Sequence, residues 1–125
     1  MKVARLRGEN NIAKPIMMLT ILTLIGKGKI IGNKISYNDE LVMTYNNIFK
    51  SFRTSNITSS IYPFYYLNSE EFYYIKGDTS RKTPSAKFLR EAVEFAVLDD
   101  QLWGMLQDTE IREELKMTII NRYLK

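Results

Sequence analysis

A run of apolar residues near the N-terminus stands out from the rest of the chain. Of the ten positions after Pro15, eight are large and aliphatic, and no charge follows until Lys27. Pro15 suits the first turn of a helix, and Gly26 suits a helix end that turns over through a left-handed residue. A helix that is apolar on all sides must be buried, and crossing a bilayer needs about 20 residues. The pattern predicts a central core helix, with a strand as the alternative.

A second helix is indicated after Ser36 and Asn38, both of which are candidate N-caps. Two acids at 39–40 fall in the first turn, where the helix dipole favours negative charge. The apolar residues that follow at helical spacing are Leu41, Tyr45, Ile48, Phe49 and Phe52. They predict one buried helix face. Between the two helices, residues 29–35 indicate a short strand or extended segment.

Aromatic and β-branched residues crowd into 61–67 and 71–76, on either side of a polar turn at 68–70. This pattern is typical of a β-hairpin, with Pro63 at an edge or at the start of its strand. The side chains are aromatic on both faces. The hairpin is therefore expected either to pack between other elements or to offer rings to a ligand or a stacked base.

The last third of the chain shows three helical patterns. Thr83-Pro84 starts the first of them, Asp99 or Asp100 caps the second, and Asp108 or Thr109 caps the third. The buried face of the first is expected to comprise Phe88, Leu89, Ala92, Val93, Phe95 and Ala96. The prediction is one mostly helical α+β domain over residues 1–125, with a winged-helix-like layout and a basic arm at 1–13.

The amino-acid composition excludes several kinds of catalytic and metal site. The chain has no cysteine and no histidine. Disulfides, thiolate metal sites, and nucleophiles activated by histidine are therefore excluded. The adjacent carboxylate pairs fall where acids serve helix starts, turns or exposed faces. We expect no enzymatic activity, cofactor or metal in this chain, and a cytoplasmic location without a membrane segment.

Charge is distributed unevenly along the chain. Residues 1–90 carry fourteen Lys/Arg and six Asp/Glu, a net charge of +8, whereas residues 91–125 carry four and eight, a net of −4. A basic body favours a polyanionic partner, although a solvated mixed surface gives the same count. The expected start of the core helix also offers free N–H groups beside Lys14. The basic candidates at expected loops or element ends are Arg5, Arg7, Lys14, Lys27, Lys29, Arg53, Arg81 and Lys82.

Three segments in order resemble one family. They are Lys14-Pro15-Ile16-Met17-Met18-Leu19, then Tyr62-Pro63-Phe64-Tyr65-Tyr66-Leu67, then residues 89–102 with Ala92-Val93-Glu94-Phe95-Ala96 at their centre. They are similar to the N-terminal domain of bacterial HNH restriction endonucleases of the Mcr type, which is related to a sulfur-binding domain. The similarity extends over about residues 12–124.

The resemblance implies a module that binds double-stranded DNA and supplies specificity to a nuclease domain or subunit. In the best-known members it recognises phosphorothioate-modified backbone. By this resemblance Tyr62 and Pro63 would form the apolar pocket for sulfur, and Lys14 would be the basic residue at the helix start. Ala13 departs from the family, because many members have histidine there. The sequence contains no nuclease half, so the expectation is an excised domain or a stand-alone specificity module.

A second hypothesis also follows from the aromatic ribbon. Such a surface could serve a protein-interaction or oligomerisation module, because exposed aromatic patches often mark protein interfaces. Both hypotheses depend on where the fold places the aromatic side chains.

Overall fold

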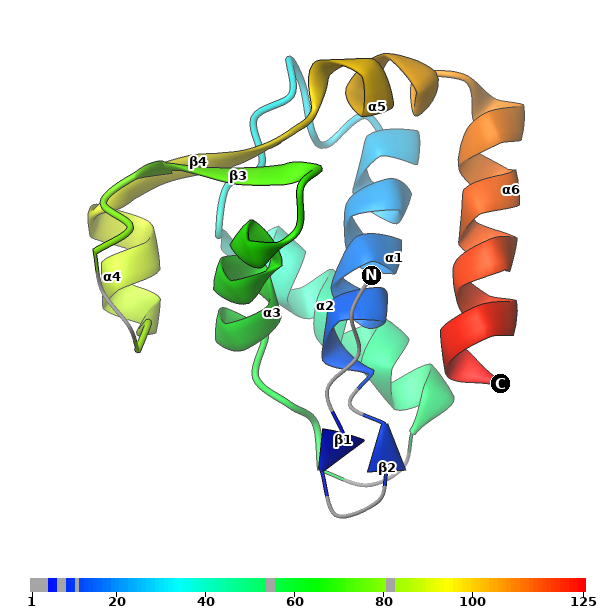
Figure 1. Cartoon of the computed structure of the whole chain (residues 1–125), viewed down its shortest axis with the longest axis horizontal. Coiled ribbons are helices and arrows are strands. Elements are labelled where there is room, and N and C mark those ends of the chain that lie inside the picture. The colour runs from blue at the N-terminus through cyan, green and yellow to red at the C-terminus, as the bar shows by residue number, and fades with distance from the viewer. Residues whose placement is uncertain (1–4, 7–8, 11, 54–55, 81–82) are drawn as a thin grey trace.

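Helix α1 (Ala13–Gly26) forms the centre of the protein, as the sequence predicts. The computed structural model describes residues 5–6, 9–10, 12–53, 56–80 and 83–125. Helices α2, α3 and α6 pack against α1 (Figure 1). Ile16, Met17, Ile21 and Leu22 have no exposed surface. Removal of each of these side chains from water stabilises the folded state by about 1.5–3 kcal/mol. With its many buried residues, α1 is the largest part of the core.

Helix α1 ends at Gly26, but the left-handed residue after it lies two positions later than predicted. Gly28, with φ at +71°, takes the left-handed conformation that the sequence suggested for Gly26. The Gly28 N–H donates to the Ile25 carbonyl at 3.0 Å, and the Lys29 N–H donates to the Leu24 carbonyl at 2.9 Å. These two bonds close a Schellman motif, which satisfies carbonyls that the helix itself leaves free.

Helix α2 (Asp39–Phe52) confirms the second prediction. The Asn38 side chain accepts a hydrogen bond from the Leu41 N–H at 2.9 Å and caps the helix. The predicted face is buried at Leu41, Tyr45 and Phe49 and partly buried at 48 and 52. Burial, helped by the nearby Tyr37, raises the pKa of the Tyr45 hydroxyl, which donates to the Thr58 carbonyl at 2.8 Å.

The predicted hairpin over 61–76 is wrong. Residues Ile61–Tyr66 form helix α3, and Leu67–Ser69 continue it as a 3-10 turn, η1. Pro63 is the third residue of α3, where no intrahelical N–H bond is lost. The side chains of Pro63, Phe64 and Tyr65 are buried. Tertiary packing therefore overrides the β preference of the aromatic residues.

The ribbon pairs β3 (Tyr73–Gly77) with the distant strand β4 (Val93–Leu98) in antiparallel register. Tyr73 faces Leu98 and Lys76 faces Phe95, and a register shift follows Lys76. Gly77 closes the shifted end at φ +125°. The predicted helix over 84–96 is thus shorter: α4 (Ala86–Glu91), capped by Ser85, ends before β4 begins.

The loop between α1 and α2 lies along the free edge of β4. Ile35 and Ala96 exchange two backbone hydrogen bonds of 2.8 Å. The Asn33 side chain donates to the Leu98 carbonyl at 2.8 Å and accepts from the Leu98 N–H at 2.9 Å. The strand expected at 29–35 is therefore reduced to one backbone bridge, at Ile35. The Asn33 side chain takes the place of a second backbone bridge.

Two further predicted helices follow β4. Asp99 caps α5 (Asp100–Met105), and Asp108 caps α6 (Thr109–Ile119), which continues as a π-helical turn, η2 (Ile120–Leu124). Before α1 in the chain, β1 (Arg5–Leu6) pairs with β2 (Glu9–Asn10) within the segment expected as an arm. No helix in the described ranges is long and apolar enough to span a membrane.

The protein is thus α+β and mostly helical, as predicted. The winged-helix-like layout is not confirmed. Its wing would have been a hairpin of consecutive strands, whereas α4 lies between β3 and β4 along the chain (Figure 1).

Candidate nucleic-acid interface

The fold separates the predicted basic residues into two groups at opposite ends of α1. Lys14 lies at its start, and Lys27 and Lys29 follow its end. Lys27 lies thirteen positions after Lys14, directly beyond the helix end, so their Cα atoms are about 20 Å apart. Lys29 lies 3.9 Å from the Glu40 carboxylate. Lys14 therefore does not lie in one cluster with Lys27 and Lys29.

Arg53 is the residue directly after α2, a helix that packs against α1 (Figure 1). Its side chain is exposed and donates only to the neighbouring Phe52 carbonyl among described contacts. Arg5 belongs to β1. Arg7, Arg81 and Lys82 lie outside the residues that the structure describes.

Lys14 connects α1 to the end of α3. Its ammonium donates to the Ser69 hydroxyl at 3.1 Å, and that hydroxyl donates to the Tyr66 carbonyl at 3.0 Å. Within the described part of the chain, no carboxylate lies within ion-pair distance of Lys14. The neighbours of Lys14 at the helix start, residues 12, 13 and 15, are buried. The lysine side chain, and not a row of free amides, is therefore what this end of α1 presents.

Tyr62 and Pro63, the two pocket residues implied by the family resemblance, have different environments. Tyr62 is 44% exposed, whereas Pro63 is buried. The Tyr62 ring stacks on the Tyr66 ring, with centroids 6.4 Å apart and planes 7° from parallel. Tyr66 is itself 41% exposed. One turn of helix separates the two residues, so α3 presents a pair of parallel rings on its outer face.

The aromatic ribbon of the second hypothesis does not form as expected. Phe64, Tyr65 and Tyr73 are buried in the core. The Tyr73 hydroxyl donates to the Phe64 carbonyl at 2.6 Å, and burial raises the pKa of Tyr73 well above its usual range. These three rings stabilise the packing of α3 on β3 and are not available to a partner.

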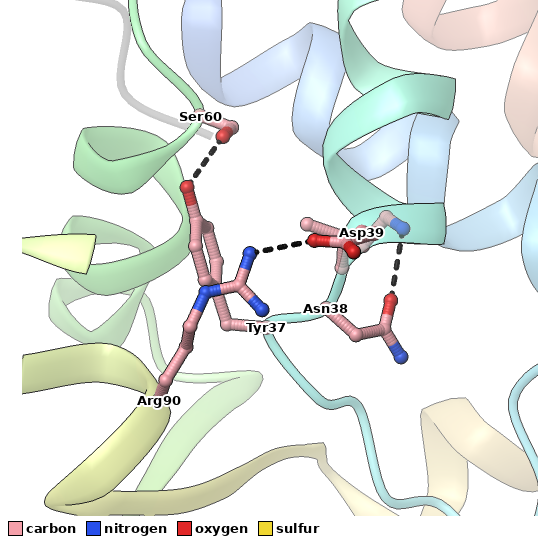
Figure 2. A network of polar contacts seen from close by, with 6 residues as sticks. Tyr37, Asn38, Asp39, Ser60 and Arg90 are labelled. Carbon is pink, nitrogen blue, oxygen red and sulfur yellow. Dashed lines mark hydrogen bonds and ion pairs between the residues drawn. The ribbon is translucent and has the colours of Figure 1, made fainter. Parts of the chain in front are cut away.

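A polar network fixes α3 and α4 against the start of α2 (Figure 2). The Tyr37 hydroxyl and the Ser60 hydroxyl share a hydrogen bond of 2.8 Å. The Arg90 guanidinium donates to the Asp39 carboxylate at 2.9 Å and lies 5.4 Å from the centre of the Tyr37 ring. Arg90 thus has a structural role, and the Asp39 carboxylate compensates its charge.

A second surface, which the sequence did not predict, lies on the outer face of the β3–β4 ribbon. Tyr74 and Lys76 of β3 and Phe95 of β4 line an open cavity of about 500 Å³ together with Lys34 and Asp100. The strand alternation of 73–77 was a usable signal for the two β3 residues, because every second residue of a strand faces the same side. Phe95 was assigned to a helix, which concealed its place opposite Lys76.

Comparison with known proteins adds no relative. No protein-family model matches the chain, and no curated protein matches it. The likeness to the HNH endonuclease domain therefore rests on the three sequence segments alone.

Proposed function

We propose that this chain binds double-stranded DNA with the surface at the start of α1. We assign to this surface, the Lys14 surface, the side chains of Lys14 and Arg53 and the stacked pair Tyr62 and Tyr66. The observation that carries the proposal is the position of Lys14. Its ammonium is held at the end of α3 by the neutral hydroxyl of Ser69, without a neutralising carboxylate in the described residues.

Electrostatics supports a phosphate ligand at this surface. Two exposed or half-exposed cations, Lys14 and Arg53, have no ion pair among the described residues, and Lys50 in the last turn of α2 adds a third. Phosphate contacts from lysine and arginine supply most non-specific affinity for a duplex. Residues 1–90, which include this whole surface, carry a net charge of +8. The long-range field of this part of the chain attracts a polyanion.

The test is a titration of a fluorescently labelled duplex over a series of salt concentrations. If Lys14, Lys50 and Arg53 each contact a phosphate, log K falls with log salt at a slope of about −2.7. Lys14→Gln and Arg53→Gln should each weaken all duplexes to a similar degree and reduce the slope by about 1. The matched control is Lys27→Gln, which removes the same charge at the other end of α1 and should leave binding unchanged.

Two results would contradict the proposal. Absence of duplex binding at low salt would remove the function itself. Equal losses from Lys27→Gln and Lys14→Gln would show that net charge, and not the Lys14 surface, accounts for binding.

The narrower part of the proposal follows the family resemblance. It gives the chain the role of specificity module in a restriction system, with the nuclease in another domain or subunit, and phosphorothioate as the recognised feature. Sulfur is larger and less hydrated than oxygen, so an apolar contact favours it. Because Pro63 is buried, the exposed Tyr62 ring is the surface that such a sulfur would contact. Matched duplexes with and without one phosphorothioate test this, and Tyr62→Ala should abolish any preference while leaving salt dependence unchanged.

A further inference from the structure

The outer face of the β3–β4 ribbon has an ordered arrangement of side chains. Tyr74 lies opposite Val97, and Lys76 lies opposite Phe95, in the antiparallel register. Strand alternation places all four on the face away from the core. The Lys34 ammonium lies 5.5 Å from the centre of the Phe95 ring. Two cations therefore stand at the Phe95 end of the face.

The other end of the same cavity is acidic. Asp99 and Asp100 line it there, at the end of β4. The Asp99 carboxylate is used as the cap of α5, where it accepts from the N–H groups of residues 101 and 102. Asp100 is exposed and has no hydrogen bond or ion pair in the part of the chain that the structure describes. From Phe95 to Asp99 is four residues of strand, or about 13 Å.

Between the two ends lies the Tyr74 ring. Tyr74 is 46% exposed, and its ring contacts no other aromatic ring among the described residues. Phe95 differs, because Lys34 already covers its ring. The cavity thus presents a cationic end at Lys34 and Lys76, a free aromatic ring at Tyr74, and an acceptor at Asp100.

We propose that this cavity binds a nucleotide, with the base stacked on Tyr74, the phosphate at Lys34 and Lys76, and the base edge at Asp100. Aromatic stacking with adjacent lysines is the means by which proteins hold unpaired bases. A duplex does not offer a base face, so this ligand differs from the one at the Lys14 surface. A carboxylate only accepts hydrogen bonds, and it therefore selects a base edge with donors. Guanine offers two adjacent donors, its ring N–H and its amino group, and is the expected preference.

The nucleotide could be free or part of an unpaired strand. Its chemistry is the same in both cases, and the experiment separates them. Backbone amide shifts of the intact chain would be followed by NMR during addition of GMP, AMP, CMP or UMP, and of short single-stranded oligonucleotides with and without guanine. We expect shifts confined to residues 32–34, 74–76 and 95–100, and tightest binding by the guanine ligands. Stronger binding of the oligonucleotide than of GMP assigns the site to an unpaired strand, and equal binding assigns it to the free nucleotide.

Three substitutions test the roles of the side chains. Tyr74→Ser should weaken nucleotide binding about tenfold, the loss typical of a base–aromatic stack, and Tyr74→Phe should restore it. Lys76→Gln should weaken it about two- to fivefold, as expected for one exposed charge contact. Lys87→Gln, an exposed lysine of α4 that lies outside the cavity, is the matched control and should have no effect.

Two outcomes would overturn the proposal. One is the absence of amide shifts on the outer ribbon face at saturating GMP and oligonucleotide. The other is equal affinity of wild type and Tyr74→Ser, with an unchanged amide spectrum showing that the variant is folded. Both are independent of duplex binding, because the Lys14→Gln variant should bind GMP like wild type. Failure of the Lys14 surface and failure of this cavity are therefore distinguishable.

Discussion

Asn33 allows a quantitative test of how the loop before α2 is held to the sheet. Its backbone has φ at +57°, a conformation that costs most residues about 1–2 kcal/mol and that asparagine tolerates better than most. Its side chain makes two hydrogen bonds to the Leu98 backbone. The residue thus combines a turn conformation with a substitute for one pair of sheet hydrogen bonds.

Asn33→Gly removes the two hydrogen bonds without adding strain. At about 0.5–1.5 kcal/mol for each bond, the loss is about 1–3 kcal/mol. The greater freedom of glycine in the unfolded chain adds about 0.4–1 kcal/mol. We expect the free energy of unfolding to fall by about 1.5–4 kcal/mol, and the melting temperature by about 3–6 °C for each kcal/mol.

Asn33→Ala loses the same hydrogen bonds and adds left-handed strain. The difference between the alanine and glycine variants should equal the effect of Gly28→Ala, within about 0.5 kcal/mol. Gly28 has φ at +71° and open space where a Cβ atom would lie, so that substitution adds strain without a clash. Urea unfolding, followed by far-UV circular dichroism and by fluorescence of the single tryptophan, measures all three variants. A glycine variant within about 0.5 kcal/mol of wild type would refute the reasoning, because the two hydrogen bonds would then contribute nothing net.

Gly77→Ala should destabilise the protein by about 3 kcal/mol or more in the same urea assay, because its Cβ would lie 2.6 Å from the Ala92 carbonyl oxygen at φ +125°. Gly104→Ala, in α5 with open space around the new methyl, is the control and should be neutral or stabilising by up to about 1 kcal/mol. Burial raises the pKa values of Tyr45 and Tyr73, so their contribution to stability is complete below about pH 10, the unfolded-state value, and is lost as pH rises above it. Tyrosinate absorbance should show two of the eight tyrosines ionising only with global unfolding, and titration of all eight in the folded protein would contradict this.

Local sequence determined helices α1, α2, α5 and α6 because their signals are local. The apolar run after Pro15 can only be buried, and Asn38, Asp99 and Asp108 cap helices through hydrogen bonds to residues two or three positions away. Such contacts join residues that are close in sequence, so they do not depend on the tertiary fold. Lys14 and Tyr62, by contrast, were singled out through the family resemblance, and their role at the proposed duplex surface stays a prediction.

The ribbon was decided by tertiary structure. Residues 93–98 combine helical spacing with the alternation of a strand, and only pairing with β3, about twenty residues earlier, selects the strand. Aromatic residues at 61–66 favour a strand by propensity, yet packing against α1 makes them a helix. Propensities of this kind amount to about 1 kcal/mol, whereas burial of one large side chain contributes more. Tyr74, Lys76 and Phe95 therefore come together only in the folded chain.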